Sequence, residues 1–265
     1  MKIPSRNWTE LDNLINKINT LKDKSSISGN EDKANHYWRL RETFSVYKLY
    51  IQSFDYLKDR NYRKAWYILE ECELMCENIS SNSNHQFLIN SGIVLIQRLV
   101  NQWQALYPYI LFISPEYKIK RTLCSICGGV IKPRTKCSHK KGILYNGELC
   151  FHIIDDFEIL NYSIVTKPVQ KYSVIHDDDR LNFNHINYLI DLLDHPFENW
   201  SFERKTMSYP IHRFNSLSQE DRCPCHSKAS FKNCCINKSE ISIPHIDYIF
   251  DKQLPSEKYQ VLFPY

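Results

Sequence analysis

Glycine is scarce in this chain of 265 residues, which contains only 6 copies of it. The glycine-rich phosphate-binding patterns GxGxxG and GxxxxGK are both missing, so the common nucleotide-binding loops are excluded. No apolar run approaches the roughly 18 residues that a membrane-spanning helix needs. The polar opening MKIPSRNWTELDNL is not typical of a signal peptide. We therefore expect a cytoplasmic protein of bacterial type with no membrane association.

A strong overall charge is also absent, because the formal net charge is only +4. Any binding of a polyanion must then depend on local clusters of basic residues. Apolar residues make up 43% of the chain, which is enough to build a hydrophobic core. The length suits one large domain or two of moderate size.

Cysteine, in contrast, is abundant, with 10 residues gathered at positions 72 and 76, at 124–150 and at 223–235. Thiols stay reduced in the cytoplasm, and a disulfide framework spreads its cysteines more evenly, so we expect metal ligands. Cys72 and Cys76 differ from the others, because they lie four residues apart on one apolar helix face. Free cysteine packs as a small hydrophobe, so we expect these two in the core.

Residues 8 to about 110 show the apolar periodicity of helices. We expect a first helix that ends at the segment KSSISGN, a long helix over residues 31–58, and a third helix that begins near residue 62. A single, buried helix is expected across HQFLINSGIVLIQRLVNQWQALYP. The N-terminal region, residues 1–112, is therefore predicted to be a helical domain.

The segment YLKDRNYRKAWYILEEC resembles the turn between the two helices of a tetratricopeptide repeat. Leu57, Tyr62 and Ala65 match that family's spacing, and Arg60 stands where the family has glycine. Only one copy is visible, and a solenoid needs about three. We expect a single helical hairpin of similar geometry.

The composition changes after residue 108. The segment ILYNGELCFHIIDDFEILNYSIVTKPVQKYSVI is rich in β-branched and aromatic residues, and its Asn-Gly pair is typical of a tight hairpin. We expect three or four strands between about 142 and 176, then a short helix that stops near His195-Pro196. The fold class is predicted to be α+β, with a zinc-knuckle and β-hairpin region over residues 113–200 and a small zinc element with an extended tail over 201–265.

The first candidate metal site lies in CSICGGVIKPRTKCSH. Cys124 and Cys127 form a Cys-x2-Cys knuckle, a turn that aims two thiolates at one point, and Cys137 and His139 follow nine residues later. These are four ligands of the type that tetrahedral zinc prefers. A disulfide and an iron or redox site are the alternatives. Cys150 is a possible replacement for His139 as fourth ligand, although we expect it to face the apolar side of a strand. The pattern suggests a zinc-ribbon or treble-clef-like unit.

The second candidate site is the stretch CPCHSKASFKNCC, which holds Cys223, Cys225, Cys234 and Cys235. Its spacing resembles the SEC-C motif, a small zinc element found at the C-terminus of the bacterial preprotein-translocating ATPase and in many other proteins. The family reads roughly Cys-Pro-Cys-Gly-Ser-Gly-Lys-Lys-aromatic-Lys-x-Cys-Cys/His.

The ligand frame of that family is complete here, and Pro224, Ser227, Phe231 and Lys232 fall on matching positions. Two pairs of residues depart from the family: His226 and Lys228 replace its glycines, and Ala229 and Ser230 replace its lysines. The resemblance implies a second bound zinc ion but covers only about 15 residues. Two zinc ions per chain, each held by four protein ligands, would be structural rather than catalytic.

A basic cluster surrounds the first site. Between Tyr117 and Lys141 the chain has eight basic residues and no acidic one. Phosphate backbones are the natural partner of such a cluster, and a solvated loop surface is the alternative. We expect nucleic acid or ribonucleoprotein as the leading partner and another protein as the second. The candidate contact residues are Lys132, Arg134, Lys136, Lys140 and Lys141.

An enzyme, such as a nuclease or toxin, is the competing class. Its metal site would use two aspartate clusters, Asp155-Asp156 and 177–179, with His152, His176 and His185. Both aspartate clusters are expected in turns, where aspartate is an ordinary residue. No Ser-His-Asp or Cys-His nucleophile arrangement is evident, so an adaptor without catalytic residues is the preferred hypothesis.

Overall fold

The computed structural model describes residues 8–132, 134, 137–175 and 178–253. The chain is α+β, as expected, with its helices mostly in the N-terminal half and two-stranded antiparallel sheets after them. It forms two compact units, Met1–Ile190 and Asp191–Tyr265. The expected segment boundaries at 112 and 200 stay a prediction.

The turns that follow the first two helices have the same backbone geometry but are built from different residues. Helix α1 (Trp8–Ile27) is followed by Gly29 and α2 (Glu31–Lys58) by Arg60, and both of these residues have a positive φ, +72° and +59°. In the second turn Asn61 N–H donates to the Tyr56 carbonyl and Arg60 N–H to that of Leu57, a Schellman cap. The third helix, α3 (Tyr62–Ser81), then packs against α2 as the predicted hairpin.

The expected fourth helix is broken in two, which corrects the sequence prediction. Helix α4 (His85–Asn90) and helix α5 (Ile93–Leu106) are separated at Gly92, whose φ is +69°. Tyr47 hydroxyl donates to the Ser91 carbonyl at 2.7 Å, and a Cβ on Gly92 would lie 2.5 Å from that hydroxyl oxygen. The break therefore exists because Tyr47 approaches a glycine backbone. Only α5 is buried, and no residue of α4 is.

Cys72 and Cys76 lie in the helical core, as predicted, and neither is exposed. Burial raises the pKa of both thiols, that of Cys76 to about 12, so they remain protonated. Leu69 of α3 and Trp103 of α5 are likewise fully buried. Among the described residues, no helix is long and apolar enough to cross a membrane.

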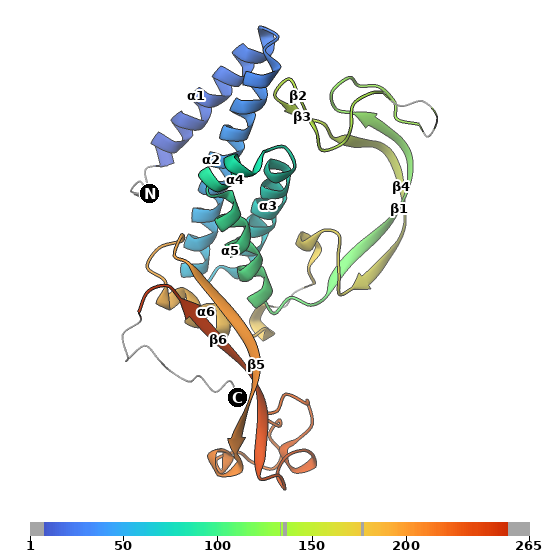
Figure 1. Ribbon diagram of the computed structural model, residues 1–265. Coiled ribbons are helices and arrows are strands. Elements are labelled where there is room, and N and C mark those ends of the chain that lie inside the picture. Colours follow the sequence, from blue (N-terminus) through green and yellow to red (C-terminus); the bar gives the residue numbers. More distant parts are fainter. Residues whose placement is uncertain (1–7, 133, 135–136, 176–177, 254–265) are drawn as a thin grey trace. The chain divides into compact units, whose positions relative to one another are not determined.

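A long two-stranded ribbon follows the helices. Strand β1 (Phe112–Cys124) pairs antiparallel with β4 (His152–Val165), and Figure 1 draws the pair as one curved ribbon. Strand β1 was not predicted. Asp155 and Asp156 were expected in a turn but lie within β4, where the register shifts near Arg121 and the Arg121 guanidinium pairs with the Asp155 carboxylate at 2.9 Å.

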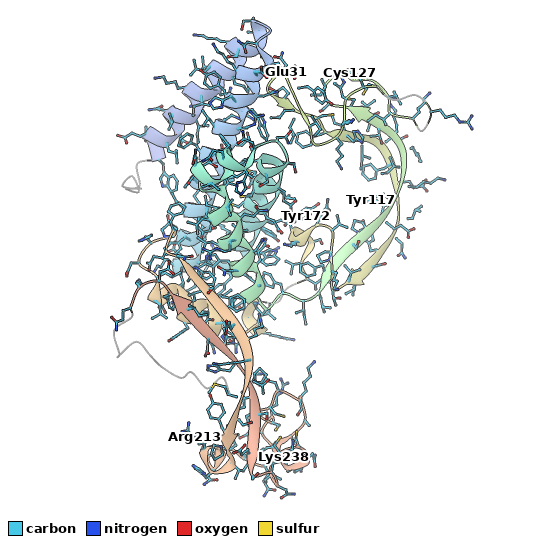
Figure 2. All side chains as sticks on the ribbon, viewed as in Figure 1. Glu31, Tyr117, Cys127, Tyr172, Arg213 and Lys238 are labelled. Carbon is cyan, nitrogen blue, oxygen red and sulfur yellow. The ribbon has the colours of Figure 1, made fainter. Side chains whose placement is uncertain are left out.

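The predicted Asn-Gly hairpin is confirmed. Strands β2 (Leu144–Tyr145) and β3 (Glu148–Leu149) are joined by Asn146 and Gly147, both at positive φ. The turn is attached to the helices by hydrogen bonds: Asn146 N–H donates to Glu31, which is labelled in Figure 2, at 3.1 Å, and Gly147 N–H donates to Asn35 at 2.7 Å. The hairpin next to the first metal site is therefore fixed to α2.

The chain returns from β4 to the helices through Lys171 in the short helix η1 (Lys171–Ser173). Its ammonium donates to Glu73 and Gln104, and its N–H donates to the Glu70 carboxylate at 2.6 Å. The short helix η2 (Asp178–Arg180) and helix α6 (Asn184–Leu192) follow, and α6 ends close to the predicted stop.

The second unit contains one antiparallel ribbon and a small core. Strand β6 (Glu240–Phe250) confirms the predicted extended chain over its own residues, and residues 254–265 of that segment lie outside the described residues. Its partner β5 (Trp200–Pro210) was not predicted. Between them lie the short helices η3 (Ile211–Phe214) and η4 (Phe231–Asn233). Buried apolar residues of the strands and loops form the core, which includes Phe214, Phe231, Ile241, Ile243 and two of the site cysteines.

Candidate metal centres

The first centre brings together the four predicted donors, Cys124, Cys127, Cys137 and His139. Their ligand atoms all lie within 4.8 Å of one another, and Cys124 Sγ is 3.7 Å from His139 Nδ1. Metal–donor bonds of about 2.3 Å to sulfur and 2.0 Å to nitrogen in a tetrahedron place such donors roughly 3.5 Å apart. The Cys124–His139 distance is close to that value, and the other donor pairs lie within 4.8 Å.

Backbone hydrogen bonds build the cysteine knuckle at the end of β1. Gly128 N–H donates to the Cys124 carbonyl at 2.8 Å, and Cys124 N–H donates to that of Gly129 at 2.9 Å. Gly128 has a φ of +67°, a conformation that glycine adopts without strain. Backbone N–H groups of Cys127 and Ile126 point at the Cys124 sulfur and lower its pKa to about 6. The knuckle thus favours the thiolate, the form that binds metal.

Cys150 lies beside this centre rather than away from it. The residue is fully buried, and its Sγ is 3.9 Å from the Sγ of Cys124. Gly142 N–H donates to its carbonyl, and its own N–H donates to Ile143, so the hairpin fixes its position. Burial and the neighbouring Cys124 sulfur raise the pKa of the Cys150 thiol to about 11. Cys150 is therefore suited to donate a hydrogen bond to the Cys124 thiolate.

The second centre is formed by Cys223, Cys225, Cys234 and Cys235, whose Sγ atoms also lie within 4.8 Å of one another. Cys225 Sγ is 3.3 Å from that of Cys223 and 3.4 Å from that of Cys234. A disulfide would need about 2.05 Å, and all ten cysteines are unbonded. The four sulfurs are therefore close enough to hold one metal ion.

Polar groups around the second centre stabilise negative sulfur. Although burial opposes it, hydrogen bonds from Ser227 and Cys223 lower the pKa of Cys225 to about 6. Lys238 carries a raised pKa because it lies beside Cys235, and Figure 2 labels it in this part of the chain. Lys238 was not predicted, since it lies outside the motif and no spacing pointed to it.

Two residues in the loop of the second centre have strained backbone. His226 and Lys228 have φ values of +62° and +69°. This left-handed region costs a residue with a Cβ roughly 1–2 kcal/mol, whereas glycine enters it freely. The loop nevertheless keeps this shape, because Cys223 N–H donates to Ala229 at 2.8 Å and His226 N–H donates to Cys223 at 3.1 Å.

The basic cluster divides into two parts. On the ribbon, Lys120 pairs with Glu158 at 3.3 Å and Arg121 pairs with Asp155, so these charges are compensated. Four others are exposed around the first centre, and within the described chain no carboxylate lies within salt-bridge distance of them. They are Lys132, Arg134, Lys140 and Lys141. The fifth candidate, Lys136, lies outside the described residues.

The aspartate and histidine clusters do not form a further centre among the described residues, where the two cysteine-containing groups are the ones found. His152 lies in β4 opposite Cys124, and Asp155 is engaged by Arg121. His176 and Asp177 lie outside the described residues. Comparison with protein-family models, curated proteins and solved structures found no match for this chain.

Proposed function

We propose that this chain is a zinc-stabilised binding protein whose first centre presents basic side chains to the phosphates of nucleic acid. The observation that carries the proposal is the pair of four-donor clusters, each already within metal-binding distance. Donor sets rich in thiolate, with one imidazole at most, favour zinc over magnesium or calcium. With four protein donors, neither centre leaves a position for a reacting water, which supports a structural role.

The resemblance to the SEC-C motif agrees with a zinc element at the second centre. That family has glycine at the two positions occupied here by His226 and Lys228, and both adopt the positive φ that glycine would favour. This agreement of backbone shape supports the resemblance although the glycines are missing. Family comparison gives no support for the motif, so this part rests on spacing and backbone shape.

The nucleic-acid part of the proposal rests on Lys132, Arg134, Lys140 and Lys141. They follow or flank the donors of the first centre and are exposed. A metal ion at this centre would hold the segment in one conformation and so reduce the entropy lost when the side chains contact phosphate. Such contacts give affinity without sequence preference and weaken steeply as salt rises.

The test is a titration of purified protein with generic duplex DNA and RNA at several salt concentrations, with zinc content measured on the same samples. We expect two zinc ions per chain and salt-sensitive binding. The triple variant Lys132→Glu, Arg134→Glu and Lys140→Glu should abolish binding in moderate salt and keep both zinc ions. Each lost phosphate contact should also flatten the salt slope by about one unit.

A matched control carries the same change of charge on the helices. Lys17→Glu, Lys24→Glu and Lys33→Glu alter three exposed residues of α1 and α2, and should leave most of the binding intact. Equal loss in both triple variants would show that only net charge matters. Absence of wild-type binding at low salt would contradict the nucleic-acid proposal and leave a protein partner as the alternative.

A further inference from the structure

The ribbon of β1 and β4 has one apolar face. Paired residues of an antiparallel ladder share a face, and the side chains along each strand alternate. The Tyr117 and Phe157 rings confirm the shared face, because they meet edge to face with centroids 5.4 Å apart. The register places eight apolar residues on this face: Ile113, Pro115, Tyr117, Ile119, Phe157, Ile159, Tyr162 and Ile164.

This apolar face is open to solvent in the single chain. Seven of its side chains are exposed, from 42% for Ile113 to 68% for Ile164. Between Ser114 and Lys118 of β1 the opposite face is polar, and it holds Ser114, Glu116, Lys118, Glu158, Asn161 and Ser163. No charged residue interrupts the apolar face between Ile113 and Ile119 on β1. Tyr117, labelled in Figure 2, lies in the middle of this stretch of the ribbon.

An exposed apolar face on a two-stranded ribbon is normally packed against another surface. Two strands alone are marginally stable in water, and a third strand or a packed face is normally required. Seven side chains of this size, each about half exposed, present roughly 100 Å² apiece, or about 700 Å² in all. Soluble monomers rarely leave a continuous apolar patch of that size uncovered.

We propose that the apolar face of the β1–β4 ribbon is a self-association surface, covered by the same face of a second copy of this chain. Two such faces would bury about 1,400 Å² together, which is within the range of stable, specific interfaces. Packed face to face, the two ribbons would form a four-stranded sandwich about 10 Å thick. A second copy supplies the same face, which is as apolar, as free of charge and as long as the face that it would cover.

Two two-fold arrangements of such a sandwich exist. An axis parallel to the strands places β1 of one copy against β4 of the other, and an axis across the strands stacks β1 on β1. The charged residues do not select one of them, because Lys118 and Glu158 lie on the opposite face and Arg121 is paired within its own ribbon.

The arrangement with the axis parallel to the strands would bring the two first centres together. A rotation about an axis along the strands keeps their direction, so both Cys124 knuckles lie at the same end of the sandwich. If the proposed binding of nucleic acid holds, two basic sites would act together with an avidity that one site lacks. The dimer itself does not depend on that binding and is tested separately.

The test is the mass of the intact protein by sedimentation equilibrium over a range of concentrations, without nucleic acid. We expect wild type to approach twice the 31.6 kDa of one chain. The double variant Ile119→Lys and Phe157→Lys should weaken the dimer at least about 30-fold, as loss of central apolar contacts does. Its control, Ser114→Lys and Ser163→Lys, adds the same charge to the opposite face and should remain dimeric.

Zinc content and circular dichroism check that both variants are folded. Should the apolar-face variant fail to fold, hydrogen exchange of wild type replaces it. Amides of residues 112–124 and 152–165 should then become more protected as protein concentration rises. A wild-type mass of one chain at all concentrations, with protection that does not change, would overturn the proposal and indicate a different partner. Equal dimerisation of both double variants would also overturn it.

Discussion

The two metal centres have similar donors but depend on different surroundings. The first is formed where a strand, a loop and a hairpin meet, and its hairpin is held by α2 through Glu31 and Asn35. The second lies within a compact lobe whose small core includes its own ligands Cys223 and Cys235. A metal ion bound at the first centre would be added to a structure that other contacts already support. At the second, two of the four candidate ligands are themselves part of the core.

This difference predicts how each region responds to loss of its metal. A structural zinc ion contributes on the order of 10 kcal/mol to the domain that binds it, and a small domain has little else to replace that free energy. The helices contain most of the apolar core, and none of the eight candidate donors lies in an α-helix. The contributions of the two centres can therefore be distinguished by two variants, each of which lacks one ligand of one centre.

The largest expected effect is that of Cys234→Ser. The variant should bind one zinc ion, and amides of residues 207–243 should lose nearly all protection from hydrogen exchange. Cys137→Ser should also bind one zinc ion, but amides of residues 142–150 should stay protected, because the hairpin keeps its hydrogen bonds to the helices. Elemental analysis and hydrogen-exchange mass spectrometry measure both. Equal loss of protection at the two centres would remove the distinction.

A second, smaller contrast concerns the fourth donor of the first centre. His139→Ala should release one zinc ion in competition with a chelator, because His139 belongs to the set of mutually close donors. Cys150→Ser should keep two ions, since Cys150 lies next to Cys124 as a protonated thiol and a hydroxyl can replace its hydrogen bond. Release of zinc by Cys150→Ser but not by His139→Ala would assign the fourth position to Cys150 instead.

Some elements of the fold could be predicted from the sequence and others could not, for physical reasons. Helix periodicity and cysteine spacing are local signals, so α2, α3 and both donor sets were foreseen. Strand β1 was missed because its basic residues and Pro115 hide the alternation of its apolar residues. Strand β5 was missed because much of it is exposed and polar.

Features that depend on contacts between residues far apart in the sequence could not be predicted either. The break at Gly92 requires the hydroxyl of Tyr47, which lies on another helix. The position of Cys150 beside Cys124 requires the hairpin to fold back onto the knuckle. Neither follows from local pattern, since each depends on which segments meet in three dimensions.

The attachment of the hairpin to the helices gives a third contrast. Gly147 has a φ of +82°, and a Cβ there would lie 3.1 Å from Cβ of Ala34 and from Cγ of Lys22. Gly147→Ala should therefore cost about 2–4 kcal/mol, from backbone strain together with overpacking. Gly142→Ala is the control, because φ is +81° there but no atom lies within 4 Å. It should cost only about 1–2 kcal/mol. Urea titration of the helical signal compares the two, and equal losses would mean that the contact with α2 contributes little.

The smallest expected effect distinguishes the two regions by their strained turns. His226→Gly and Lys228→Gly remove positive-φ strain from the loop of the second centre, and Arg60→Gly removes it from the turn between α2 and α3. Relief of about 1–2 kcal/mol per residue is partly offset by the greater flexibility of glycine in the unfolded chain, so each gain should be about 0.5–1 kcal/mol. The gain at the second centre should appear as slower loss of zinc to a chelator, because folding of that lobe and metal binding are one equilibrium. The gain at Arg60 should appear instead as a higher midpoint of helical unfolding, with zinc loss unchanged. If Arg60→Gly also slowed zinc loss from the second centre, the two regions would be energetically coupled, and their treatment as separate units would be wrong.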